Sequence, residues 1–108
     1  MKITDVTCSV LIVPDYQTDA CDSAQDTIVV KVHTDEGLIG IGETDANPYV
    51  IKAMIEATGS HIMSLGLREL LVGQDPTEPI ALWDRLYTFS AMTGRRGAGM
   101  CPLLFPRP

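Results

Sequence analysis

The first half of the chain alternates between apolar and polar residues with the period of two that is typical of β-strands. Residues 3 to 13 place one set of apolar side chains on a common face: Val6, Cys8, Val10 and Ile12. Pro14 ends this strand, because proline cannot donate to a sheet ladder. The alternation returns in residues 27 to 34, where Ile28, Val30 and Val32 face one way. Residues 14 to 26 between them form a long polar loop, and loops of that length are usually functional or mobile.

A tight turn joins the second strand to a third. Asp35-Glu36-Gly37 predicts a hairpin in which Gly37 supplies the positive φ of a bulged turn. Residues 38 to 42 make the third strand. Gly40 and Gly42 leave gaps on one of its faces, which suggests that another backbone or a ligand comes close there.

The spacing becomes helical after Asn47-Pro48, because asparagine caps the free amides of a helix start and proline suits its first position. Ile51, Met54, Ile55 and Thr58 share a face, and Gly59 is the expected stop. A second helix is predicted over 64–72 and a third over 77–90. The third carries apolar residues on two sides, so we expect it to be buried on two faces. The fold class is therefore α+β: a three-stranded antiparallel meander followed by a three-helix bundle.

Length and charge limit the functions that are open to the chain. Its 108 residues make one domain, 45% of them apolar. Eight basic against fourteen acidic residues give a net charge of −6, which argues against nucleic-acid binding and against binding to anionic lipid. There is no apolar run long enough to span a membrane and no signal-peptide pattern. Cys8, Cys21 and Cys101 are too far apart for a disulfide framework or a zinc motif, so we expect a cytoplasmic protein with reduced thiols.

Few residues suggest chemistry on their own. Glu43 is expected just after the third strand, where functional carboxylates are often placed, although a loop-capping or ion-paired carboxylate is the more common case. His33 and His61 have no second ligand at metal spacing, and no Ser, Thr or Cys has an activating motif. Arg95-Arg96 concentrates positive charge that suits an anionic substrate, a partner's carboxylate or a solvated linker. From the residues alone, no catalytic or metal site is predicted.

Five motifs in order resemble a known family. They are TDEGLIGIGE, the Asn-Pro helix start, LLVGQDP, LWDRLY and TGRRG. Over about residues 1 to 100 the chain is similar to the amino-terminal capping domain of the mandelate racemase and muconate lactonizing enzyme group of the enolase superfamily. The RRG leans towards the acid-sugar dehydratases of that group. The resemblance implies a cap that closes over a (β/α)8 barrel and excludes water from its active site.

The resemblance also implies roles for particular residues. The two loops that cover the barrel mouth match residues 14–26 and 44–49. The residues expected to face substrate are Tyr16, Thr18, Asp22, Asp45 and Asn47. Those expected at the cap–barrel junction are Glu43, Arg95 and Arg96.

Family chemistry abstracts a proton next to a carboxylate, with Mg²⁺ stabilising the enediolate. The resemblance places its acidic metal ligands and its base on the barrel, which needs at least about 200 residues. We therefore expect this chain to bind no cofactor, to be catalytically inactive alone and to act on a carboxylate substrate only with a barrel. Residues 101–108, CPLLFPRP, stand where the family continues into a helix, and a truncated or frame-shifted reading frame or a deliberately shortened chain would produce such a tail. The alternative is a stand-alone binding or oligomerisation module, for which self-association is expected.

Overall fold

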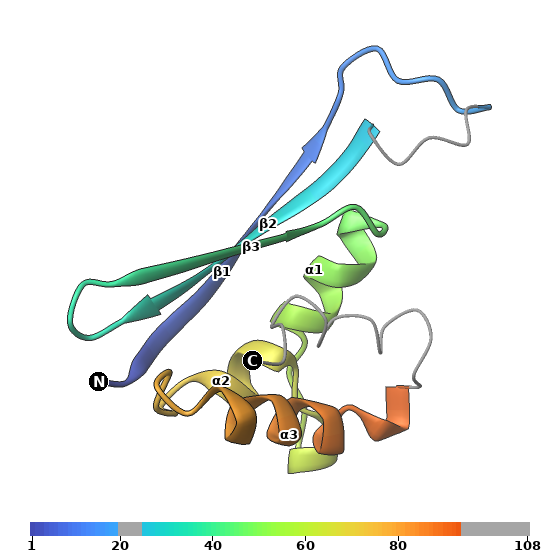
Figure 1. Cartoon of the computed structure of the whole chain (residues 1–108). Coiled ribbons are helices and arrows are strands. Elements are labelled where there is room, and N and C mark those ends of the chain that lie inside the picture. Colours follow the sequence, from blue (N-terminus) through green and yellow to red (C-terminus); the bar gives the residue numbers. More distant parts are fainter. Residues whose placement is uncertain (20–24, 94–108) are drawn as a thin grey trace.

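The computed structural model describes residues 1–19 and 25–93, and it shows a sheet followed by helices (Figure 1). The strands are β1 (Ile3–Ile12), β2 (Asp26–Thr34) and β3 (Ile39–Thr44). The α-helices are α1 (Pro48–Glu56), α2 (Leu67–Leu71) and α3 (Pro79–Phe89), with 3₁₀ turns η2 (Ile62–Ser64) and η3 (Ala91–Thr93). The predicted α+β class, an antiparallel meander followed by three α-helices, is confirmed. Asp22, Arg95, Arg96 and the tail 101–108 lie outside the described residues.

The sheet has the order β1-β2-β3 with both neighbouring pairs antiparallel. Its register places Val6 opposite Val32, and Val32 opposite Gly40, on the face that the helices cover. The hairpin turn after β2 is as predicted: Thr34 N–H donates to the Leu38 carbonyl at 3.1 Å, and Gly37 has a φ of 81°. Figure 1 shows the hairpin of β1 and β2 running out beyond the helices.

The helices bury one core against the inner face of the sheet. Helices α1 and α2 pack over β1 and β2, and α3 packs on α2. The fully buried side chains come from every one of these layers: Val6, Ile28, Val30, Ile51, Ile55, Leu67, Leu70, Leu71 and Leu86. No helix within the described part of the chain is long and apolar enough to cross a membrane.

Two of the predicted helix boundaries are wrong for one reason. Helix α1 ends at Glu56 and not near Gly59, and the second predicted helix is divided into η2 and α2. Gly66, the residue before α2, has an extended backbone, and its N–H donates to the carbonyl of Ala57 at 3.0 Å. That contact holds both residues outside helical geometry, so it stops one helix and delays the next.

The third helix is buried on one face only, which corrects the expectation of two. Leu86 is fully buried, whereas Ile80 is 55% exposed and Tyr87 is 42% exposed. The half-buried Trp83 connects the two sides of the helix, because its ring stacks on that of the exposed Tyr87 with the centroids 4.9 Å apart.

The segment between α2 and α3 is hydrogen-bonded to the first residue of β1. Gly73 N–H donates to the Ile3 carbonyl at 2.8 Å, and Ile3 N–H donates to the Gln74 carbonyl at 2.9 Å. Gly73 has a φ of 88°, a conformation that other residues rarely adopt. Gly73 and Gln74 of the LLVGQDP motif therefore connect the helices to the start of β1.

Candidate functional site

The two loops expected to face substrate leave the sheet at the same end. Strands β1 and β3 both flank β2 and run in the same direction. Their last residues, Ile12 and Thr44, therefore lie at the same end of the sheet. Ile12 pairs with Asp26 and Thr44 pairs with Ile28, a stagger of two residues along β2, or about 7 Å. The described parts of segments 14–26 and 44–49 therefore both begin at this end of the sheet. We call these described residues the lip of the domain.

A double hydrogen bond closes the base of the first loop. The backbone N–H of Gln17 donates to the side-chain oxygen of Gln25 at 2.7 Å, and the Gln25 side-chain amide donates back to the Gln17 carbonyl at 3.0 Å. Next to it, Val13 N–H donates to the Gln25 carbonyl at 3.1 Å. These contacts hold the chain on either side of Tyr16, which is 55% exposed. Thr18 follows Gln17 directly and is also exposed. Asp22 lies outside the described residues.

The two hydrogen bonds between Gln17 and Gln25, here called the glutamine clamp, were not predicted from the sequence. Gln17 and Gln25 are two of many polar residues in the loop, and no local pattern marks them as partners. A weak signal exists: an amide side chain offers both a donor and an acceptor, so it can bridge a backbone N–H and C=O at once.

The second loop is short and ends in the cap of α1. Asn47 is the N-cap of α1, as predicted, and its side-chain oxygen accepts from Tyr49 N–H at 3.1 Å and from Val50 N–H at 3.4 Å. Because that oxygen is occupied, the side-chain amide is the part of Asn47 left for another contact. Asp45, between β3 and α1, is exposed, and its carboxylate is an acceptor at the same lip.

Glu43 does not follow the strand but lies inside it, because β3 runs two residues further than predicted. It is exposed and opposite Val29, and the alternation along β3 puts it on the face away from the helices. No ion pair joins it to Lys31, which lies opposite Ile41, within residues 1–19 and 25–93. Its expected place at a cap–barrel junction stays a prediction, and Arg95 and Arg96, the other residues of that prediction, lie outside the described residues.

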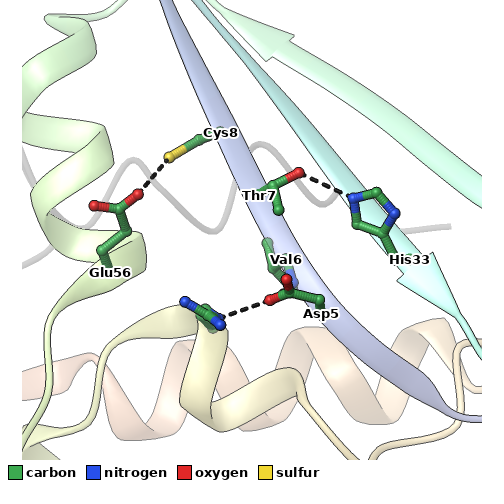
Figure 2. A network of polar contacts seen from close by, with 7 residues as sticks. Asp5, Val6, Thr7, Cys8, His33 and Glu56 are labelled. Carbon is green, nitrogen blue, oxygen red and sulfur yellow. Dashed lines mark hydrogen bonds and ion pairs between the residues drawn. The ribbon is translucent and has the colours of Figure 1, made fainter.

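Polar contacts on β1 connect the strand to α1, α2 and β2 (Figure 2). Asp5 forms an ion pair with Arg68 at 2.8 Å, and the Thr7 hydroxyl lies 2.9 Å from the His33 ring. The Cys8 thiol donates to Glu56 at 3.5 Å. Burial raises the pKa of the Cys8 thiol, and the neighbouring Glu56 carboxylate raises it further. Cys8 is therefore held as a thiol and not as a nucleophilic thiolate.

The described residues do not form a magnesium site. Within residues 1–19 and 25–93, no three His, Cys, Asp or Glu side chains come together in a way that holds a metal ion. Mg²⁺ prefers several oxygen ligands in octahedral geometry, and that donor set is not assembled here. We therefore assign no metal-dependent step to the described side chains.

An open apolar groove of about 570 Å³ lies between the start of β3 and α3. Its walls include Ile3, Val32, Leu38, Gly40, Trp83 and Leu86. Nothing lies within 4 Å of the place a Cβ would take at Gly40, so the predicted gap at this glycine is open space. None of its described lining residues has a charged side chain, so the groove offers no side-chain partner for a carboxylate.

A family model for the mandelate racemase / muconate lactonizing enzyme N-terminal domain matches residues 6–100. This chain belongs to that family. Among solved structures, it is similar to a protein from Rhodobacter sphaeroides described as a predicted mandelate racemase, with 30% sequence identity and a TM-score of 0.62 over 97% of this chain. A member of the enolase superfamily from Polaromonas sp. JS666 shares 25% identity over 82% of this chain, with a TM-score of 0.59.

Similarity in fold extends further. A racemase from Streptomyces coelicolor A3(2), solved with bound magnesium, has a TM-score of 0.66 over 94% of this chain at 20% identity, which shows the fold alone. This chain covers 25%, 23% and 28% of the Rhodobacter, Polaromonas and Streptomyces chains respectively. It therefore spans about a quarter of the length of these relatives and corresponds to their N-terminal domain.

Proposed function

We propose that this domain is the substrate-selecting cap of an enzyme whose Mg²⁺ ligands and catalytic base lie on a (β/α)8 barrel that this chain does not contain. The observation that carries the proposal is that both loops leave the sheet at the same end, in a chain that belongs to the mandelate racemase / muconate lactonizing enzyme family. A cap with such a lip covers the mouth of a barrel, excludes water and contacts the part of the substrate that projects from the metal. We propose that the enzyme acts in the cytoplasm.

The chemistry of the lip favours a substrate with hydroxyl groups. Asp45 offers a carboxylate, which repels the carboxylate of a substrate but accepts hydrogen bonds from hydroxyls. Tyr16 and Thr18 add hydroxyls that both donate and accept. We therefore propose that the lip binds the hydroxylated end of an acid-sugar-type substrate, while the substrate's carboxylate is held at the barrel. Proton abstraction next to that carboxylate, leading to dehydration, racemisation or cycloisomerisation, belongs to the barrel.

The first test uses the chain as it is. The pure 108-residue protein, assayed with Mg²⁺ against a panel of acid sugars and other carboxylates, is expected to show no turnover. Mg²⁺-dependent turnover that survives a second purification would overturn the proposal, because it would require a catalytic site within this chain.

The second test asks whether the lip selects substrate. Residues 1–93 replace the cap of the Rhodobacter sphaeroides relative, and kcat/KM is measured for a panel of acid sugars. In this fusion, Asp45→Ala is expected to reduce kcat/KM for its preferred substrate about tenfold or more, the loss of a hydrogen bond to a charged group. Asp84→Ala is the matched control, since Asp84 is also an exposed aspartate but lies on α3, outside both loops.

The second test can also contradict the proposal. An active fusion whose substrate preference is unchanged by Asp45→Ala, Tyr16→Phe and Thr18→Val would show that the lip does not select substrate. Circular dichroism and Mg²⁺ titration of each variant establish that it is folded and binds metal before its kinetics are compared.

A further inference from the structure

The outer edge of β3 has no partner in the described structure. The sheet ends at β3 on one side and at β1 on the other. The β1 edge is partly covered, because segment 73–74 exchanges two backbone hydrogen bonds with Ile3. Within residues 1–19 and 25–93, no backbone hydrogen bond reaches β3 from the side opposite β2.

The register identifies which groups are free along this edge. Thr34 N–H donates to the Leu38 carbonyl, so Leu38 points its backbone polar groups towards β2. In an antiparallel ladder the hydrogen-bonded and non-hydrogen-bonded positions alternate. Gly40 and Gly42 therefore also bond to β2, whereas Ile39, Ile41 and Glu43 point their N–H and C=O groups outwards.

Glu43 is the one charged residue of β3, and residues 38–42 before it lack the usual protection against pairing. Natural edge strands carry charges, prolines or bulges that keep other strands away. Residues 38–42 read Leu-Ile-Gly-Ile-Gly, and the pairing of β2 with β3 continues without a bulge. Leu38, Ile39 and Ile41 are 59%, 53% and 70% exposed respectively. An exposed, regular and apolar edge is a template for another strand.

We propose that β3 pairs antiparallel with β3 of a second copy of this chain, about a two-fold axis at Ile41. This register places Ile41 opposite Ile41 and Ile39 opposite Glu43, so every outward-pointing residue of the strand meets another outward-pointing residue. Such a contact is isologous and closes as a dimer.

The side chains agree with this arrangement. On the inner face Gly40 of one copy meets Gly42 of the other, so no side chains collide between the strands. On the outer face Ile41 of one copy meets Ile41 of the other, and Lys31 of each copy lies beside its own Ile41 on β2. Two β-branched side chains then lie directly opposite each other, an arrangement that favours pairing.

The expected association is weak. One strand pair buries less area than the roughly 1,600 Å² of a standard stable interface. The net charge of −6 on each copy adds repulsion, which salt screens. The dimer should therefore appear as the concentration rises and become tighter as the salt concentration rises.

The test is a concentration series of the full 108-residue chain in the analytical ultracentrifuge, at low and high salt. Ile41→Lys puts a charge on the free edge and is expected to weaken dimerisation at least about tenfold. Ile80→Lys is the matched control, because Ile80 is 55% exposed and lies on α3, away from the edge. Both positions are exposed, so circular dichroism should show both variants folded.

Amide hydrogen exchange locates the contact. On going from dilute to concentrated protein, the amides of Ile39 and Ile41 should become protected, whereas those of Gly40 and Gly42 should be protected at both concentrations. A monomer at all concentrations, a dimer that Ile80→Lys weakens as much as Ile41→Lys, or a dimer without this alternating pattern would each overturn the proposal.

Discussion

The hydroxyl of Thr27 donates a hydrogen bond to the backbone carbonyl of Thr44 at 3.1 Å. Thr27 is the second residue of β2 and Thr44 is the last residue of β3, so this bond fixes the point at which the second loop leaves the sheet. The first loop enters β2 through Gln25 and Asp26, immediately before Thr27. One short stretch of β2 thus carries the anchors of both loops of the proposed lip.

Replacing Thr27 with valine keeps the shape of the side chain and removes the hydroxyl. The free energy of unfolding should fall by about 1 kcal/mol, the usual contribution of one partly buried hydrogen bond. Urea unfolding measures this change. Thr4→Val is the control, because Thr4 is exposed on β1 and its hydroxyl has no hydrogen bond among the described residues; its effect should stay within about 0.5 kcal/mol. Equal losses in both variants would contradict the role given to Thr27.

Two glycines should respond in opposite ways to alanine. A Cβ at Gly66 would collide with the backbone carbonyl of Ala57, whereas a Cβ at Gly40 would meet nothing within 4 Å. Gly66→Ala should therefore cost about 1–3 kcal/mol, as overpacking usually does. Gly40→Ala should be neutral or stabilise by up to about 1 kcal/mol, because glycine inside a strand is unfavourable. Thermal unfolding of both variants checks the order, and a stable Gly66→Ala protein would show that the contact with Ala57 is easily adjusted.

What could be predicted from the sequence depended on how local its cause was. The strands, the Gly37 turn and the Asn47 cap follow from neighbours within a few residues, and all are present. The end of α1 depends on Gly66, nine residues beyond Ala57, and no pattern along the chain shows that contact. The buried face of α3 was also not predictable, because both sides of the helix are apolar and packing on α2 selects one.

The candidate site divides in the same way. Asn47 was recognisable because capping is local, and the common lip follows once the meander is known, since alternate strands of a meander end on the same side. The clamp of Gln17 by Gln25 was not predictable, because many polar residues of the loop are equivalent until the strands fix which of them meet.

The pH dependence of Cys8 reactivity tests the environment of its thiol. Because burial and Glu56 raise its pKa, less thiolate is present at pH 8 than for a free cysteine, and alkylation by iodoacetamide should be slower. Glu56→Gln removes the negative charge, so it should lower the pKa and speed the reaction. Lys52 acts in the opposite direction, and Lys52→Ala should slow it.

Peptide mass spectrometry follows Cys8 separately from the other two cysteines of the chain. A raised pKa also means that the folded state holds the proton more tightly than the unfolded chain. The stability this provides is fully present below the unfolded pKa and is lost as the pH rises through the folded pKa. If both substitutions changed the rate in the same direction, a change in access and not in charge would explain them.

Asp75 should show the opposite shift, because its carboxylate accepts hydrogen bonds in the charged form. The Thr77 hydroxyl donates to Asp75 at 2.6 Å and the Thr77 N–H donates at 2.8 Å, and together they lower the pKa of this carboxyl. The stability linked to it is present above the unfolded pKa and is lost as the pH falls through the folded value. Carbon NMR of the side-chain carboxyl measures the titration directly. Thr77→Val should raise the pKa part of the way towards about 3.9, since the backbone donor remains, and Thr77→Ser should leave it low. A pKa that moved equally in both variants would show that the backbone of the turn, and not the hydroxyl, sets it.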